Sequence, residues 1–90
     1  MFSLVWTDFF KRKATKFLQK HPDLKDNFKE LVTLMEINPF EQSLKTHKLK
    51  GNLKEFYGIS LTYSYRLVVD IKVTKNEIIL LNIGSHDEVY

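Results

Sequence analysis

The feature that most constrains the fold of this chain is a change in the spacing of its apolar residues at Pro39. Before Pro39 the apolar residues recur at helical intervals, and in the C-terminal half every second residue is apolar over long stretches. Helical spacing predicts amphipathic helices, whereas alternation predicts strands with one buried face. The sequence therefore predicts helices in the first part of the chain and a sheet in the second.

Two helices are predicted between residues 7 and 38. Thr7 can cap the first, which carries apolar residues at helical spacing from Phe10 to His21 and ends at Pro22. The second begins near Asp23 and stops at Asn38-Pro39. Its apolar stripe consists of Leu24, Phe28, Leu31 and Met35. Because the two helices are close in sequence, we expect an antiparallel pair.

Strands are predicted on both sides of this pair. Residues 2–6 alternate as a short first strand, and after a loop at 40–46 a second short strand is expected at 47–50. Alternation over 59–73 predicts a hairpin that turns near 62–64, and 77–83 is a nearly all-apolar last strand. Gly51-Asn52 and Lys75-Asn76 are turn signals, Gly84 is expected to break the last strand, and 85–90 is predicted to be a short tail.

This order predicts an α+β fold in a single domain, 1–90, with two N-terminal helices packed on one face of a twisted sheet. Tight turns between most strands require antiparallel neighbours, so a mainly antiparallel sheet of four or five strands is expected. The other face of the sheet is predicted to be partly open. Arg66 must point to that face if the odd-numbered apolar residues around it are buried.

Composition excludes several kinds of site. The chain has no cysteine, which rules out disulfides and thiolate chemistry. Its three histidines are far apart in sequence and there is no clustered set of carboxylates, so neither a metal site nor another cofactor is expected. No apolar run approaches the ~20 residues of a membrane span. Without cysteines, a signal peptide or a membrane span, the sequence predicts a cytoplasmic protein, and its net charge of +3 favours a polyanionic partner.

Four lysines surround His47 in the segment 44–54 and are candidates for RNA binding. They are Lys45, Lys48, Lys50 and Lys54. Ammonium groups gathered on short strands and turns attract phosphates and make binding depend on salt. The alternative is a solvated edge, because lysines also protect exposed strand edges from pairing.

Three further side chains in the C-terminal half are candidates for chemistry. Arg66 offers a rigid guanidinium to a phosphate, unless it only forms a surface ion pair with Asp70. His86 follows the last strand and can exchange protons near neutral pH, unless its role is structural. The terminal Tyr90 can stack on a base, cover the edge of the core or contact a partner. This set suits metal-free cleavage of RNA, in which a base deprotonates the 2′-OH, a cation stabilises the phosphorane and an acid protonates the leaving oxygen.

Taken in order, three segments resemble one family. His47-Lys-Leu-Lys-Gly-Asn-Leu, Tyr65-Arg-Leu-Val-Val and Ile79-Leu-Leu-Asn-Ile-Gly-Ser-His-Asp-Glu-Val-Tyr90 are similar to segments of the RelE/YoeB/YafQ superfamily of bacterial toxins, within the larger RelE/ParE group. Val5-Trp6 before a helix is similar as well. The resemblance spans nearly the whole chain and is most specific in its C-terminal half. It implies a type II toxin-antitoxin toxin that cleaves mRNA in the ribosomal A site without metal.

The resemblance also assigns roles to individual residues. It implies His47 as the general base, Arg66 as the contact to the scissile phosphate, His86 as the general acid and Tyr90 as the terminal aromatic of the YafQ group. It assigns Lys48, Lys50 and Lys54 to a basic loop that grips RNA. The chain departs from YafQ where Ser60 and Ser64 stand near positions of further His and Asp residues, and Glu55 is a spare candidate for the base.

Two other functions are compatible with the same fold. One is a ParE-like toxin that inhibits DNA gyrase by binding, and the other is an inactive module that only holds its antitoxin. Only a nuclease needs His47, Arg66, His86 and Tyr90 to converge around one phosphate, which favours the nuclease. The expected partners are a cognate antitoxin, mRNA and the ribosome with its rRNA, and a heterotetramer with the antitoxin is one arrangement that the family admits.

Overall fold

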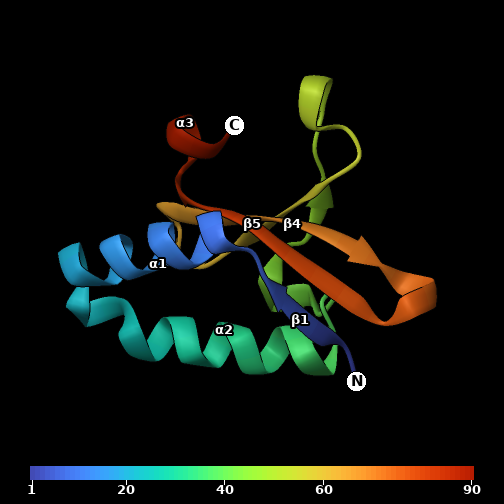
Figure 1. Cartoon of the computed structure of the whole chain (residues 1–90), viewed down its shortest axis with the longest axis horizontal. Helices are drawn as coiled ribbons and strands as arrows, with labels where there is room; N and C mark the ends of the chain where they lie inside the picture. The colour runs from blue at the N-terminus through green and yellow to red at the C-terminus, as the bar shows by residue number, and fades with distance from the viewer.

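A computed structural model describes the whole chain, residues 1–90. Strand β1 (Ser3–Trp6) leads into helices α1 (Asp8–Lys20) and α2 (Lys25–Ile37), as Figure 1 shows. The remaining elements are the strands β2 (His47–Lys48), β3 (Tyr57–Ser60), β4 (Tyr65–Lys72) and β5 (Glu77–Ser85), and the C-terminal turn of helix α3 (His86–Val89). No helix in this fold has the length and apolar character that crossing a membrane would require.

The five strands form one sheet in the order β1-β5-β4-β3-β2. The strands β2 to β5 pair antiparallel with their neighbours, and β1 alone runs parallel to its partner β5. Strand β5 therefore lies between β1 and β4, which explains why its sequence is almost entirely apolar. The predicted α+β fold, with two N-terminal helices on a mainly antiparallel sheet, is confirmed.

The helices cover one face of the sheet with a large apolar core. Fourteen buried residues form this cluster, among them Phe10 and Met35 from the helices and Leu67 and Leu80 from the sheet, all four with 0% exposure. Thr7 ties the first helix to the sheet: its Oγ1 accepts the Phe10 N–H at 3.1 Å and donates to the Leu80 carbonyl at 2.7 Å. The cap that the sequence predicts therefore also fixes α1 against β5.

The opposite face, here called the open face, carries a much smaller cluster of three buried residues, Leu49, Val68 and Val89. A bulge between Val68 and Val69 shifts the register of β4 against β5, so that Val68 pairs with Asn82 and Val69 with Leu80. The extra residue, Leu81, packs against the open-face cluster. Figure 1 shows α3 on the side of the sheet away from α1 and α2.

Several sequence-based boundaries are wrong. Gly84 does not break the last strand, which continues to Ser85, and the predicted tail contains helix α3. Gly84 is buried in β5, and a Cβ there would lie 3.1–3.3 Å from atoms of Glu88 and Val89. This glycine allows the C-terminal turn to fold back onto the strand rather than ending it.

Other predicted elements are shorter than expected. The second strand covers only His47–Lys48 and is followed by a 3-10 turn at Gly51–Leu53. Alternation predicts a strand through Val73, but β4 ends at Lys72 and Val73 is 56% exposed in a 3-10 turn. The second helix begins after a 3-10 turn at Pro22–Leu24, because proline favours the first turn of a helix.

Candidate functional site

A cavity of about 480 Å³ lies on the open face, between β2, the turn that follows it and α3. Its polar lining includes His47, Lys48, Lys50, His86 and Tyr90. These residues come from two segments about forty positions apart, so the fold itself brings them together. We call this cavity the histidine pocket.

His47 stands on β2, where it pairs with Gly58 of β3. Its Nδ1 lies 3.0 Å from the carbonyl oxygen of Lys45, which adopts a left-handed conformation with φ 50°. When Nδ1 donates to this carbonyl, the tautomer is fixed and Nε2 keeps a free lone pair. His47 is exposed, so that nitrogen is accessible to a substrate proton.

The second histidine, His86, is held by a capping box at the start of α3. The Ser85 hydroxyl accepts the Glu88 N–H at 3.4 Å, and Glu88 Oε1 accepts the Ser85 N–H at 2.8 Å. Hydrogen bonds to the carboxylate from the backbone N–H of Ser85 and then from its side chain hold the pKa of Glu88 below its usual value, with a smaller contribution from the charges of Lys13 and Lys20. Ser85 and Glu88 thereby set the direction in which His86 leaves the strand.

Tyr90 lies between the two histidines. Its ring centroid is 4.6 Å from that of His86 and 6.5 Å from that of His47, both in edge-on geometry. Gly58 makes this position possible, because a Cβ at residue 58 would overlap the Tyr90 hydroxyl and approach His47 Cε1 to 3.2 Å. Burial raises the pKa of the Tyr90 phenol, while the positive charge of Arg66 acts in the opposite direction. The phenol therefore stays protonated at neutral pH and can donate a hydrogen bond.

Arg66 lies on β4 beside Tyr90, on the open face as predicted. Its Nη1 is 3.5 Å from Ser60 Oγ across the β3–β4 pair, and its Nε is buried with no hydrogen-bond partner. The alternative of an ion pair with Asp70 is wrong, because Asp70 pairs with Lys72 at 3.1 Å. No carboxylate pairs with the guanidinium, so its positive charge is not neutralised within the protein, and its buried Nε–H is left without a partner.

The four lysines around His47 are not equivalent. Lys48 and Lys50 line the histidine pocket, whereas Lys45 and Lys54 do not. The Lys48 ammonium lies 4.9 Å from the centre of the Tyr57 ring and 3.5 Å from the Lys54 carbonyl oxygen. Glu55, the spare candidate for the base, is exposed outside the pocket lining.

Sequence reasoning missed Gly58, Ser85 and Glu88 as residues that build the site. The spacing Ser85-x-x-Glu88 is a capping-box signature and was available as a signal. Nothing local to Gly58 indicates that a residue 32 positions away in the chain lies over it.

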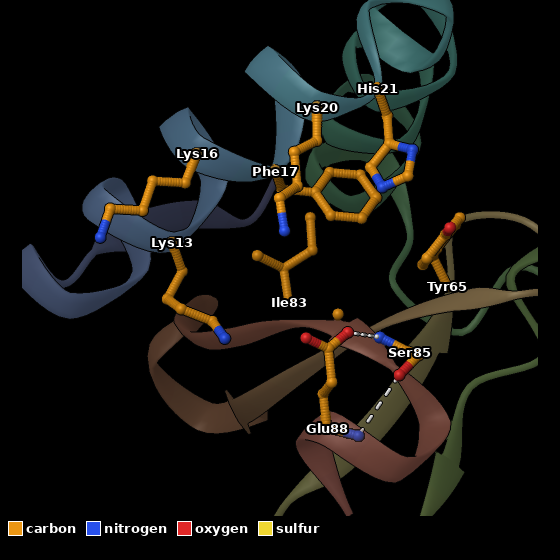
Figure 2. A pocket seen from close by; sticks show the side chains of 10 residues that line it. Lys13, Lys16, Phe17, Lys20, His21, Tyr65, Ile83, Ser85 and Glu88 are labelled. Atoms are coloured by element: carbon orange, nitrogen blue, oxygen red, sulfur yellow. Dashed lines mark hydrogen bonds between the residues drawn. The ribbon is translucent and has the colours of Figure 1, made fainter.

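A second cavity, of about 350 Å³, lies behind α3 and faces α1. Figure 2 shows Lys13 reaching from α1 toward Glu88, with Ser85 beside that carboxylate. Lys16 and Lys20 complete its basic lining, and Phe17, His21 and Tyr65 give it an aromatic wall. No sequence pattern predicts this cavity, because its two walls come from segments far apart in the chain. We call it the lysine pocket.

Together, the histidine pocket and Arg66 offer two imidazoles, a phenol and a guanidinium on one surface. Imidazoles transfer protons near neutral pH, and a guanidinium stabilises the negative charge on phosphate oxygens. No three His, Cys, Asp or Glu side chains are gathered in a way that suits a metal ion. The arrangement is suited to acid–base chemistry beside a phosphate.

Comparison with known protein families identifies the chain. A family model described as "Bacterial toxin of type II toxin-antitoxin system, YafQ" matches residues 2–90. The chain belongs to the YafQ toxin family. Among curated protein sequences no significant match is found.

Solved structures share the fold of this chain. A metal-bound toxin from Helicobacter pylori is 28% identical, with complete coverage of both chains and a TM-score of 0.81. YafQ from E. coli strain BL21(DE3) is 17% identical, with 100% of this chain and 99% of that chain covered and the same TM-score of 0.81. YafQ in the E. coli DinJ-YafQ toxin-antitoxin complex is 18% identical, with 99% and 97% coverage and a TM-score of 0.78. The predicted resemblance to RelE-type toxins near YafQ is confirmed.

Proposed function

We propose that this YafQ-family toxin is an endoribonuclease that cleaves mRNA in the ribosomal A site without a metal ion, and so inhibits translation in the cytoplasm. One observation carries the proposal. Two histidines from opposite ends of the C-terminal half meet around Tyr90, next to an arginine whose buried Nε lacks a partner. A binding-only toxin has no need for this convergence.

The reaction follows from the side chains in and beside the histidine pocket. His47 Nε2 takes the proton of the ribose 2′-OH, and the 2′ oxygen attacks the adjacent phosphorus. Arg66 stabilises the negative charge that gathers on the phosphorane oxygens, and the Tyr90 hydroxyl donates a hydrogen bond to them. His86 gives its proton to the departing 5′ oxygen as the P–O5′ bond breaks. The products are a 2′,3′-cyclic phosphate and a 5′-hydroxyl end.

The lysines of segment 44–54 hold the RNA strand in this scheme. Lys48 and Lys50 lie at the pocket itself, where ammonium groups attract the phosphates beside the scissile one. Lys45 and Lys54 lie outside the pocket lining and contribute only to the positive electrostatic potential around the pocket. We expect substitution of Lys48 and Lys50 to reduce affinity more than substitution of Lys45 and Lys54.

A cognate antitoxin is the proposed protein partner. Toxins of the same fold are known in complexes, YafQ with DinJ from E. coli and YoeB with YefM from Staphylococcus aureus, the latter a heterotetramer. For this chain we propose that acidic side chains of an antitoxin cover the basic open face. A heterotetramer is the arrangement to test first by light scattering of the co-expressed pair.

The decisive experiment is primer extension on mRNA after a pulse of toxin expression. We expect cuts within translated frames for the wild type and none for His86→Ala or Arg66→Ala, with folding and antitoxin binding retained. Lys29→Ala is the matched control, because Lys29 is an exposed cation on α2, outside the histidine pocket. Because ribosomes need Mg²⁺ to stay assembled, chelation is tested on RNA without ribosomes, where cleavage by the purified toxin should continue in EDTA. Full toxicity of both alanine variants would favour a binding-only function, and loss of cleavage on chelation would contradict the mechanism.

A further inference from the structure

We propose that the lysine pocket binds a phosphodiester group of RNA, beside the group that enters the histidine pocket. The proposal rests on the nuclease function above, and it assigns a second, separate subsite to the same polyanion. The supporting observations are the spacing of three lysines on α1, their lack of ion-pair partners and the position of the cavity relative to α3.

The lysine pocket is formed by one face of α1. Lys13, Lys16 and Lys20 follow each other at intervals of three and four, which brings them to the same side of a helix. Below them, the end of β5 and the start of α3 form the opposite wall with Gly84, Ser85 and Glu88. Figure 2 shows the lysine side chains on one side of the cavity and Glu88 on the other.

An aromatic wall closes one end of the pocket. The His21 ring lies 4.6 Å from Phe17 and 4.8 Å from Tyr65, and Phe17 lies 4.9 Å from Tyr65 edge-on. Phe17 is buried, so the half-buried rings of His21 and Tyr65 are the part of this wall on which a base of a single strand can stack. A phosphate near the lysines would place its sugar and base toward this wall.

The charge of the lysine pocket is not neutralised within the protein. The chain has two ion pairs, Lys72 with Asp70 and His86 with Asp87, and neither involves a lysine of this pocket. Glu88 is the one acidic side chain in the lining, and its carboxylate already accepts the Ser85 N–H. Three lysines and one carboxylate in the lining give the pocket a net positive charge, which a phosphodiester can neutralise.

The two pockets lie on either side of the C-terminal turn. Ser85 and Glu88 line the lysine pocket, whereas His86 and Tyr90 line the histidine pocket. Helix α3 has only four residues, about one turn, so little of the protein separates the two pockets. A single strand that crosses this turn can therefore present one phosphate to each pocket. The phosphate can come from the mRNA strand or from ribosomal RNA, and the test separates the two sources.

The test compares two double variants of the same helix. Lys13→Gln/Lys20→Gln removes two charges from the pocket, and Lys11→Gln/Arg12→Gln removes the same charge from exposed positions outside its lining. Binding is measured to a single-stranded oligoribonucleotide with 2′-O-methyl sugars, which cannot be cut, and to vacant ribosomes. We expect the pocket variant to lose about tenfold in affinity at low salt in one or both arms. In a plot of the logarithm of affinity against the logarithm of salt concentration, the slope should become shallower by ~0.7 for each phosphate of a single strand that the protein no longer neutralises. The affinity of the control variant should change less than about twofold.

Glu88→Gln tests the proposal in the other direction, because it should raise the affinity for RNA. Glutamine can complete a capping box as glutamate does, so α3 should keep its place while the pocket loses its one negative charge. We expect this variant to bind RNA a few-fold more tightly. Circular dichroism of all variants checks that the helices remain folded.

The outcomes separate this proposal from the nuclease proposal, because binding is read with RNA that cannot be cleaved. If the pocket variant alone loses affinity for the oligonucleotide, the bound phosphate belongs to mRNA. If it loses affinity only for ribosomes, the phosphate belongs to ribosomal RNA. Equal losses for the pocket and control variants in both arms would overturn the proposal, since net charge alone would then explain binding. Weaker binding by folded Glu88→Gln would overturn it as well.

Discussion

The two faces of the sheet differ in what their side chains contribute. Fourteen buried apolar residues fill the face beneath α1 and α2, whereas the open face buries three. The open face instead carries His47, Arg66 and the histidine of α3, with one buried N–H unsatisfied. Folding free energy therefore comes chiefly from the helix-covered face, and the open face is free to hold polar groups that would weaken a core.

The largest expected effect is the loss of a core aromatic from the helix-covered face. Phe10 is 0% exposed and packs against Trp6 and Phe28, with ring centroids 5.7 and 6.4 Å away. Phe10→Ala should lower the free energy of unfolding by about 3–5 kcal/mol, a large part of the stability of a small domain. Val89→Ala on the open face should lower it by about 1–2 kcal/mol, from ~0.8 kcal/mol per buried CH₂. Urea unfolding measures both, and equal losses would contradict the contrast between the faces.

The second expected effect is on the open face, where a substitution should reduce activity without reducing stability. Arg66→Met keeps a long apolar stem but removes the guanidinium, whose Nε is buried without a partner. We expect RNA cleavage to fall by about 10²–10³, as for other groups that stabilise a transition-state anion. The free energy of unfolding should stay the same or rise, because an unsatisfied buried N–H is removed. A clear loss of stability in this variant would mean that Arg66 supports the fold.

The helix-covered face was largely predictable from the sequence, because periodicity reports directly on burial. The spacing of Phe10, Phe28 and Met35 gives the helix stripes, and the alternation around Leu67 gives the strand face. The candidate site was predictable where a residue type carries its own chemistry, as for His47 and Arg66. The resemblance to the toxin family, which depends on the order of these residues along the chain, then assigned each of them a role.

What the sequence could not predict depends on long-range contacts. The bulge that turns Leu81 toward the open face arises from strand register, which no local pattern encodes. The contact of the Tyr90 side chain with Gly58 is between residues far apart in the chain. Lys13 belongs to a pocket only because β5 ends beneath α1. Such features follow from how the elements pack and not from the elements themselves.

A smaller effect is expected where Gly58 and Tyr90 meet. Gly58→Ala adds a Cβ where the Tyr90 hydroxyl lies, so the C-terminal ring must move. We expect a destabilisation of about 1–3 kcal/mol, as for other overpacked sites, together with reduced cleavage. Combining Gly58→Ala with Tyr90→Phe removes the overlapping hydroxyl and should recover part of the stability. A double-mutant cycle by urea unfolding measures this coupling, and purely additive losses would place Tyr90 elsewhere in solution.

The smallest expected effect is a shift in the titration of Glu88, which links the open face to α1. Hydrogen bonds from Ser85, and then the charges of Lys13 and Lys20, keep the pKa of this carboxyl below its ordinary 4.5. Because the folded pKa is lowered, the ionised carboxylate stabilises the C-terminal turn above about pH 4.5 and this contribution disappears as the pH falls through the folded value. A carbon-detected NMR titration should show Ser85→Ala raising the pKa most, Lys13→Gln raising it less and Lys11→Gln leaving it unchanged. A wild-type titration at 4.5 would show that Glu88 does not close the capping box in solution, and α3 would then hold His86 without it.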